Sequence, residues 1–397
     1  MKGFFHNYFP SYGIKNIRFY YFFLFFSNGW FVLGNWIFLW LKYITVGQIG
    51  LIDSIAFILG ILLEIPSGAV SDLLGKKKTL ILASILHISG LCLMVSGKDT
   101  LTLGIGNILF FSGTAFFSGS SEAFGYDSLV EYKKEKNYSL LASKFHFIEL
   151  VATFLTAGIG GYLFMISPEL PWYLWIIFKV IALCIIVKFK EPSVDSEVFS
   201  ISTYKSQLLR GFKFLARSPI KHYAIVFILL SFVYHSWSVG IIRPLMAESF
   251  GFTGETLSYA ISLILIISSV AVLLVPRVKQ KLGNSLGLSL LSIILAVSFI
   301  APVLFPINIH GGFFIILTIM VIGKIRIPWM SEVLNVRIES KERATVLSTI
   351  ALITQLPYPL ISLAGGMLAE KNLLGIVYIL FVVLLIAAAY VSKRFIQ

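Results

Sequence analysis

Several carboxylate side chains lie inside or at the ends of long apolar segments of this 397-residue chain. A charge within a lipid bilayer costs several kcal/mol, so an ionisable residue there is a candidate for a function. Because a low-dielectric surrounding disfavours the charged form, such a carboxylate can bind and release protons near neutral pH. We therefore predict a proton-coupling group, and its candidates are Glu64, Glu122, Asp127 and Glu149.

Glu149 heads a polar stripe along one predicted helix. Helical spacing places it on the same face as Thr153, Thr156 and Gly160, which is typical of a face turned toward a bundle interior. This stripe favours a functional role for Glu149. Glu64 and Glu122 lie nearer to basic loops, so a structural pairing with a cytoplasmic Lys or Arg explains them equally well.

A second group of residues within apolar segments could contact a substrate. Lys324 and Arg326 are about 200° apart around a helix, so both cannot face one cavity unless the helix breaks at Pro328. One cation could bind an anionic substrate group, or both could form structural ion pairs that join the two halves. His235 could relay a proton, stack on a ligand or simply be hydrogen-bonded. The substrate-binding candidates are Asn28, Asn35, Asp53, Thr153, His235, Trp237, Lys324 and Arg326.

Three of these candidates belong to the first two apolar segments. Asn28 and Asn35 are predicted to share one face of the first span. Asp53 and Glu64 share a face of the second, because residues eleven apart differ by only about 20° of rotation. Asp53 is nearer the external mouth, where it could simply be solvated.

The composition indicates an all-helical integral membrane protein. Hydrophobic residues make up 57% of the chain and charged residues 13%, and the mean hydropathy is +0.89. A soluble domain carries about 25% charged residues, and membrane barrel strands alternate in polarity over about ten residues, so both classes are excluded. The net charge of +13 is divided into short clusters between apolar runs, so no nucleic-acid partner is expected. Cys92 and Cys184 lie inside apolar segments and indicate neither a disulfide nor a metal site.

Apolar runs long enough to cross a bilayer core of about 30 Å recur along the whole chain. Lys and Arg cluster in alternate loops, so the positive-inside rule predicts that both termini are cytoplasmic. The N-terminus shows no cleavage site of a removable signal peptide. The twelve predicted spans are residues 19–40, 47–66, 79–96, 101–124, 145–166, 172–188, 222–242, 257–275, 285–305, 312–334, 345–368 and 373–391.

The chain is predicted to consist of two six-helix halves related by a duplication. Gly75 and Gly283 end corresponding loops 208 residues apart, and the same offset pairs Glu131 with Glu339. We predict an N-terminal bundle over 1–188, a cytoplasmic central loop over 189–221 and a C-terminal bundle over 222–397. An amphipathic piece within that loop could be an interfacial helix, and a plain linker explains it equally well.

The loop Gly68-Ala-Val-Ser-Asp72-Leu-Leu-Gly75-Lys76-Lys-Lys resembles the signature between spans two and three of the major facilitator superfamily. Leu73 departs from the basic residue usual after the aspartate. Weaker matches, such as Glu64-Ile-Pro-Ser-Gly68, resemble bacterial drug-efflux-like members. The resemblance implies a gate that opens and closes during transport. The predicted gating residues are Gly68, Asp72, Gly75, Lys76 and Arg343, with Asp72 capping the next helix and pairing with Arg343.

The leading hypothesis is a secondary transporter, not an enzyme, that works by alternating access with its site between the halves. The resemblance favours proton-coupled efflux of a small molecule across a bacterial inner membrane, although the partial glycine motif of Gly158, Gly160 and Gly161 leaves the direction open. Alternatives are a carrier for an anionic metabolite or siderophore, a lipid flippase, and an integral membrane enzyme or receptor. The expected partners are the substrate, protons and the lipid bilayer. A monomer without cofactor or metal is predicted.

Overall fold

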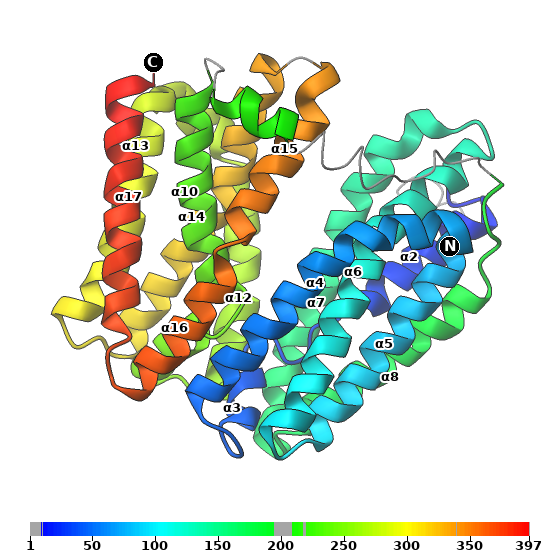
Figure 1. The fold of residues 1–397 in the computed structure, drawn as a ribbon, viewed down its shortest axis with the longest axis horizontal. Helices are drawn as coiled ribbons and strands as arrows, with labels where there is room; N and C mark the ends of the chain where they lie inside the picture. The colour runs from blue at the N-terminus through cyan, green and yellow to red at the C-terminus, as the bar shows by residue number, and fades with distance from the viewer. Residues whose placement is uncertain (1–8, 10, 194–208, 217–219, 339, 397) are drawn as a thin grey trace. The chain divides into compact units, whose positions relative to one another are not determined.

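The computed structural model describes all residues except 1–8, 10, 194–208, 217–219, 339 and 397, and it leaves out the side chains of 65, 332–337 and 340–344. The described residues form helices and connecting turns, with no strand among them (Figure 1). The predicted all-helical membrane class is confirmed.

The helices of the first part of the chain are α2 (Lys15–Ser27), α3 (Trp36–Trp40), α4 (Val46–Leu74), α5 (Lys76–Ser96), α6 (Thr100–Val130), η1 (Glu135–Asn137), α7 (Tyr138–Ile166) and α8 (Leu170–Val187). Those of the second part are α10 (Lys221–Ser238), α11 (Ile242–Ser249), α12 (Gly254–Val272), α13 (Val275–Leu304), α14 (Ile309–Arg337), α15 (Ser340–Gln355), α16 (Tyr358–Glu370) and α17 (Gly375–Phe395). Residues 209–216 form a further short helix.

Local sequence explains where two helices begin. Asp99 caps α6, where its carboxylate accepts the Thr102 N–H at 2.9 Å and the Thr102 hydroxyl at 2.8 Å. These hydrogen bonds from the backbone and the hydroxyl hold the pKa of the Asp99 carboxyl below its usual range. Thr253 and Thr256 form a reciprocal capping box at α12.

Ten helices in the described part of the chain are long and apolar enough to span a membrane, and α10 joined with helix 209–216 would make eleven. About twelve spans were predicted, and two of them are not single helices: span 345–368 is interrupted at residues 356–357, between α15 and α16, and span 19–40 is broken as well. Residues 28–35 lie in turns that divide the predicted span 19–40 into α2 and α3. Asn28 and Asn35 stand at the two ends of this break, so they do not share a helical face.

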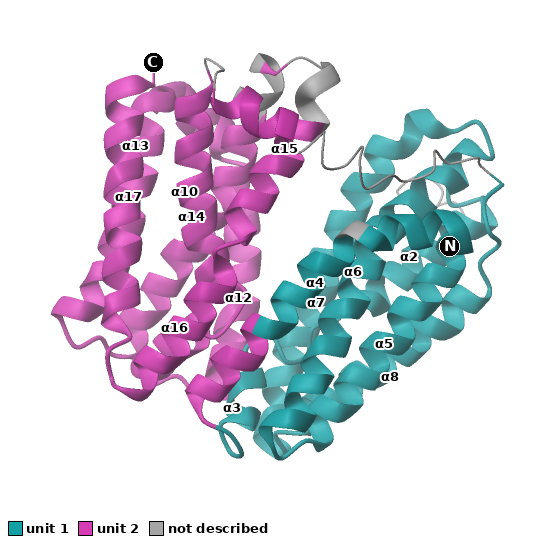
Figure 2. Cartoon of the chain, viewed as in Figure 1, with its two compact units in different colours: residues 1–44, 55–201 teal, residues 45–54, 202–397 magenta. Residues whose placement is uncertain are grey.

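The chain folds into two compact units (Figure 2). The first comprises residues 1–44 and 55–201, and the second comprises 45–54 and 202–397. The first turns of α4 therefore belong to the second unit, whereas the rest of that helix belongs to the first. In the first unit α5 packs along α6, and in the second α13 packs along α17.

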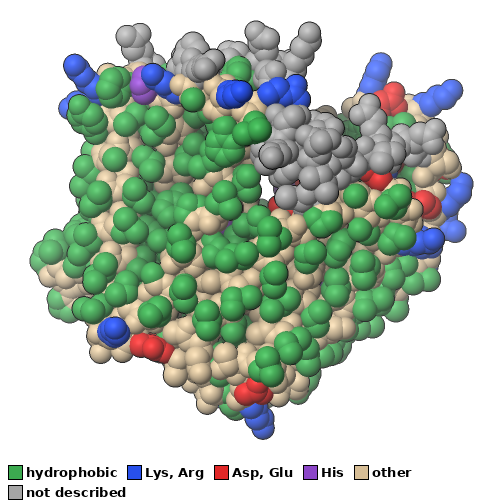
Figure 3. All heavy atoms as spheres, in the orientation of Figure 1, with side chains coloured by type: hydrophobic (Ala, Val, Ile, Leu, Met, Phe, Trp, Pro, Cys, Tyr) green, Lys and Arg blue, Asp and Glu red, His purple; other side chains and the backbone are tan. Residues whose placement is uncertain are grey.

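Apolar side chains also cover the outer helix surfaces, as Figure 3 shows on the visible face. Leu62 is 57% exposed, Leu273 74% and Ile386 56%. A water-soluble protein seldom exposes contiguous apolar surface on this scale, whereas a lipid bilayer solvates it. The unit interiors are apolar as well, and one cluster of the first unit gathers Tyr20, Phe23, Leu24, Phe124 and Phe189.

Gly75 and Gly283, the glycines paired by the predicted duplication, share an unusual backbone conformation. Their φ angles are +89° and +67°, a region that only glycine adopts without strain. In each case the chain turns sharply between helical segments, at α4–α5 and at the kink inside α13. A glycine is thus required at both positions for the same physical reason.

Candidate functional site

The turn between α4 and α5 is held by a carboxylate that the sequence prediction did not assign to it. Glu191, which follows α8, accepts the backbone N–H groups of Lys76 at 2.6 Å and Lys77 at 2.9 Å. Free N–H groups and the positive end of the helix dipole favour an anion there. The expectation that Asp72 caps α5 is therefore wrong, because α5 has Gly75 at its N-cap and takes its anion from Glu191.

Lys76, predicted as part of the gating motif, forms an ion pair with Asp127 of α6. Both side chains are about nine-tenths buried. Asn16 of α2 binds the segment that follows α8, because its side chain donates to the Lys190 carbonyl at 2.8 Å and accepts the Lys190 N–H at 3.0 Å. Helices α2, α4, α5, α6 and the end of α8 are thereby joined at one end of the first unit.

The other predicted gating residues lie near this junction or outside the described part of the structure. Gly68 lies within α4, and Asp72 is half-buried near the end of the same helix. Arg343 belongs to α15, but its side chain is outside the described residues. Gating by these residues stays a prediction.

The four proton-coupling candidates differ in their surroundings. Asp127 has Lys76 as its counter-ion, and Glu149 lies 3.3 Å from His146 on the same helix. Glu64 is exposed on α4. Glu122 is also exposed, and it forms no ion pair with any described residue of its unit. Glu64 and Glu122 are thus the two candidates without a counter-ion in this part of the structure.

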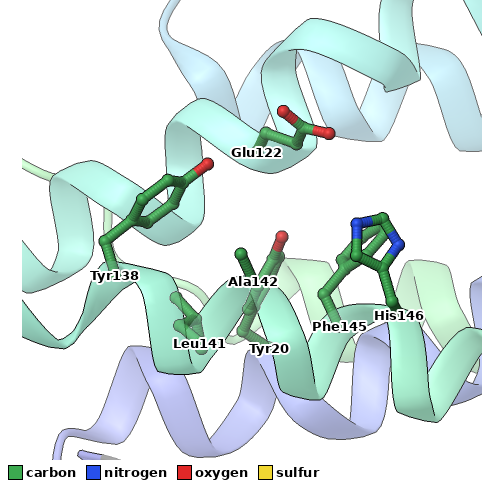
Figure 4. A pocket seen from close by; sticks show the side chains of 7 residues that line it. All are labelled: Tyr20, Glu122, Tyr138, Leu141, Ala142, Phe145 and His146. Carbon is green, nitrogen blue, oxygen red and sulfur yellow. The ribbon is translucent and has the colours of Figure 1, made fainter. Parts of the chain in front are cut away.

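Glu122 lines a partly open cavity of about 110 Å³ between α2, α6 and α7 (Figure 4). Figure 4 shows Glu122 on α6 across this space from the labelled side chains of α7, with Tyr20 of α2 beside them. The residues that line it are Tyr20, Glu122, Tyr138, Leu141, Ala142, Phe145 and His146. The cavity therefore combines one carboxylate with an aromatic wall.

The broken first span is held by the polar stripe of α7. The Trp30 N–H donates to the Thr156 hydroxyl at 2.8 Å, and the Thr153 hydroxyl donates to the Asn28 carbonyl at 3.2 Å. A third hydrogen bond of 3.2 Å runs from the Asn35 amide to the Gly160 carbonyl. Backbone groups that the break leaves without helical partners are thus satisfied by α7, as a membrane interior requires.

Gly160 allows this close approach. A Cβ atom at this position would overlap the Phe31 carbonyl oxygen, which belongs to the backbone of the break. The polar stripe of α7 therefore acts first as a structural partner of the broken span. Asn28, Asn35 and Thr153 are brought together here, all within the first unit.

Lys179 of α8 is a buried cation at the end of α2. Its ammonium group donates to the Ser27 carbonyl at 2.7 Å and lies 6.0 Å from the centre of the Trp175 ring. Ser27 is the last residue of α2, where unsatisfied carbonyls and the helix dipole favour a positive charge.

Asp53 is buried in the second unit, which rules out the alternative that this substrate-binding candidate is simply solvated. Its carboxylate accepts hydrogen bonds from the Tyr358 hydroxyl and, at 2.7 Å, from the Ser362 hydroxyl, both of α16. The His235 ring contacts the Tyr358 ring edge to face, with 5.5 Å between centroids. Tyr358 and Ser362 were missed because about 300 residues separate them from Asp53 and no local pattern links them.

Arg326 of α14 is the second polar centre of this unit. It is 8% exposed, its Nε donates to the Ser231 hydroxyl at 3.0 Å, and the guanidinium lies 4.3 Å above the Tyr234 ring centre. A further hydrogen bond joins Arg326 to the Gly323 carbonyl. Among the described residues of this unit Arg326 has no carboxylate partner, so no structural ion pair is found there.

Two further substrate candidates lie on α14 and α10, the helices that carry Arg326 and Tyr234. Lys324 is half-buried on the same helix, which stays helical through Pro328. Trp237 is fully buried, and its indole N–H donates to the Met246 sulfur at 3.4 Å. Trp237 thus acts as a packed core residue of the second unit.

Two compact units of membrane-length helices, with buried charges inside each unit, define a polytopic membrane protein. A family model of the Major Facilitator Superfamily matches residues 19–357. Because this match covers most of the chain, the protein belongs to the Major Facilitator Superfamily. It is a secondary transporter rather than an enzyme.

Solved structures support the same fold. The nucleoside transporter NupG is 14% identical with a TM-score of 0.72, over 96% of this chain and 98% of that one. A bacterial homologue of the iron transporter ferroportin is 13% identical with a TM-score of 0.71, over 96% and 97%. A D-xylose-proton symporter is 13% identical with a TM-score of 0.66, over 96% of each chain. At this identity the likeness shows the fold alone, and a search of curated proteins found no match.

Proposed function

We propose that this transporter is a proton-coupled exporter of an amphipathic small molecule. It works by alternating access as a monomer in a bacterial inner membrane, with both termini in the cytoplasm. The observation that carries the proposal is Glu122, which lines an open cavity and has no ion pair with the described residues of its unit. A carboxylate of this kind is free to exchange its proton during a transport cycle.

The surroundings of the other carboxylates support Glu122 as the coupling group. Asp127 is ion-paired with Lys76, so protonating it would leave a buried ammonium group without its partner. Glu149 already has a partner, because its carboxylate lies 3.3 Å from the His146 ring nitrogen. Glu64 is exposed on α4 and does not line the cavity. Among the four candidates, Glu122 is the one that lines this cavity and has no counter-ion in the described part of its unit.

The direction of transport rests on the resemblance of Glu64-Ile-Pro-Ser-Gly68 and the Asp72 loop to bacterial drug-efflux-like members of the superfamily. An aromatic cavity also suits an amphipathic molecule better than a sugar, which needs many hydrogen-bonding groups.

One observation favours a second candidate function, the transport of an anionic metabolite or siderophore. Arg326 is buried, stacked on Tyr234 and without a carboxylate partner among the described residues of the second unit. A planar guanidinium with a remaining N–H group binds carboxylate or phosphate oxygens well. In this reading Arg326, and not Glu122, contacts the substrate.

Transport by purified protein in liposomes tests the proposal. Ethidium, chloramphenicol and citrate represent cationic, neutral and anionic molecules, and their accumulation is measured with and without an imposed pH gradient. We expect the gradient to drive accumulation of ethidium or chloramphenicol. Glu122→Gln should abolish that response, whereas Glu135→Gln, in the exposed η1 turn, should keep it. The proposal would be overturned if transport did not respond to the pH gradient, or if transport by Glu122→Gln still responded to it. Citrate transport lost in Arg326→Gln would establish the second candidate.

A further inference from the structure

We propose that the cavity at Glu122 is a binding site for the ammonium head of an organic cation, formed by the first unit alone. The inference deepens the proposed function, on which it rests for its biological role, because it assigns the charge class of the exported molecule. The site would hold this molecule near one end of helices α2, α6 and α7.

The charge of the cavity is the first argument. Glu122 is the only Asp, Glu, Lys or Arg among its lining residues, and the remaining titratable groups that face it are Tyr20, Tyr138 and His146. Lys144, the lysine of α7, is directed to other partners. Its ammonium group lies over the rings of Phe9 and Phe147, at 5.8 and 5.9 Å from their centres. The carboxylate is thus left to attract a cation from outside the protein.

The aromatic wall is the second argument, because aromatic faces attract cations and reject anions. Tyr20 is held in place by a hydrogen bond of 2.9 Å from its hydroxyl to the Ser121 carbonyl. Tyr138 packs edge to face on Tyr126, with 5.1 Å between ring centroids. The rings of Phe145 and His146 are perpendicular, with 5.2 Å between their centroids. The rings are therefore positioned before a ligand arrives, which lowers the entropy lost on binding.

The size of the cavity decides which part of a cation fits. Its volume of about 110 Å³ is below the roughly 300–1,000 Å³ of sites that enclose a whole drug-sized molecule. It suits a substituted ammonium head, and the apolar body of the molecule would leave through the open side. A metal ion needs several oxygen, nitrogen or sulfur ligands around one centre. No group of three such ligand residues occurs among the residues that the structure describes.

The face of α7 that lines the cavity is the same helix face that carries the polar stripe further along. Tyr138, Ala142, Phe145 and Glu149 follow one another at spacings of three or four residues, so they lie on one face of the helix. That face leads on to Thr153, whose hydroxyl binds the Asn28 carbonyl at the broken span. A cation bound at Glu122 would therefore lie on the same helix face as the contacts that hold the break.

Equilibrium binding of radiolabelled choline to the purified full-length protein tests the inference, because choline carries a trimethylammonium head. The alcohol 3,3-dimethylbutan-1-ol has almost the same size and shape without the charge, so it is the matched control probe. We expect choline to bind the parent protein and the neutral alcohol not to compete. Glu122→Gln should weaken binding by about tenfold or more, because a charge-assisted contact in a partly desolvated site is typically worth at least that factor.

Three further variants separate the site from indirect effects. Tyr138→Phe keeps the ring and should bind nearly as well as the parent, whereas Tyr138→Ala should weaken binding several-fold. Glu135→Gln removes one negative charge from a nearby exposed turn and should leave binding unchanged. Circular dichroism and thermal unfolding identify any variant that fails to fold, in which case the ring substitution Tyr138→Phe and the probe pair still decide the question.

Unchanged choline binding in Glu122→Gln, or equal binding of the neutral alcohol, would overturn the inference. This outcome differs from failure of the proposed function, because binding is measured at equilibrium without a pH gradient. A protein that binds the cation through Glu122 but moves no protons would retain the site and lose the coupling. If transport is driven by the pH gradient but cation binding does not depend on Glu122, the proposed proton coupling stands and the proposed binding site is refuted.

Discussion

Replacing Glu191 with alanine should destabilise the first unit by removing the anion at the start of α5. The carboxylate accepts two backbone N–H groups, at 2.6 Å and 2.9 Å. An N-cap contributes about 0.5–2 kcal/mol, and a hydrogen bond to a charged group about 1.5–3 kcal/mol when it is shielded from water. Because Glu191 is exposed, solvent screening lowers the second figure. We expect Glu191→Ala to lower the free energy of unfolding by about 2 kcal/mol.

Glu191→Gln keeps the shape of the side chain and one amide oxygen that can accept an N–H group. The free energy of unfolding of this variant should therefore fall by only about half as much, about 1 kcal/mol. For a unit of this size 1 kcal/mol corresponds to about 2–4 °C in Tm, so Glu191→Ala should lower Tm by about 4–8 °C. Glu135→Gln, at an exposed turn of the same unit, serves as the control and should leave Tm unchanged.

Thermal unfolding of the purified protein is followed through its tryptophan fluorescence, and hydrogen exchange reports on the Lys76 and Lys77 amides. These two amides should exchange faster in Glu191→Ala, while amides at the middle of α5 stay protected. If Glu191→Ala unfolds within 1 °C of the parent (about a quarter of the smallest expected shift) and both amides stay protected, the capping role of Glu191 is refuted.

Two further substitutions test the sequence-based assignments in the first unit. Asp72→Asn should leave the fold and Tm intact but slow transport severalfold or more, measured as initial rates in liposomes, and parent-like turnover would remove Asp72 from the gate. Glu149→Gln should uncouple transport from the pH gradient if the stripe of α7 carries the proton. Because Glu149 lies beside His146 and Glu122 lines the open cavity, we expect coupling to survive in Glu149→Gln and to fail in Glu122→Gln. The reverse result would place the proton-coupling group on α7.

Membrane class and spans were predictable because they depend on summed properties of neighbouring residues. Apolar runs of about twenty residues and basic clusters between them are local features, and each can be read without knowing what packs against it. The signature around Asp72 was equally local, and it pointed to the family that the match over residues 19–357 shows. The glycines at 75 and 283 were paired from sequence by their offset of 208 residues, and the structure gives both a backbone conformation that other residues avoid.

The partners of the charged residues were not predictable in the same way. Asp53 pairs with Tyr358 and Ser362, and Lys76 pairs with Asp127, across distances along the chain that carry no sequence signal. The break in the first span was hidden as well, because residues 28–35 lie inside a long apolar run and contain no proline.

Gly29 and Gly34 weaken a helix at the break but do not by themselves end one. The stability of the broken segment comes from hydrogen bonds with Thr153, Thr156 and Gly160 of α7. Those partners lie more than a hundred residues away along the chain, so only the packing of α7 against the segment reveals them.

By itself, the sequence determined that this chain is an all-helical membrane protein, because hydropathy and charge are sums over adjacent residues, and its transporter class was indicated by the resemblance of the loop around Asp72. Tertiary structure alone decided which intramembrane charges are neutralised and which remain available. Packing brings a cation to Asp127, whereas Glu122 has no ion pair with the described residues of its unit. The distance between two charges depends on how separate helices pack, and the Coulomb energy of a pair depends steeply on it and on the surrounding dielectric.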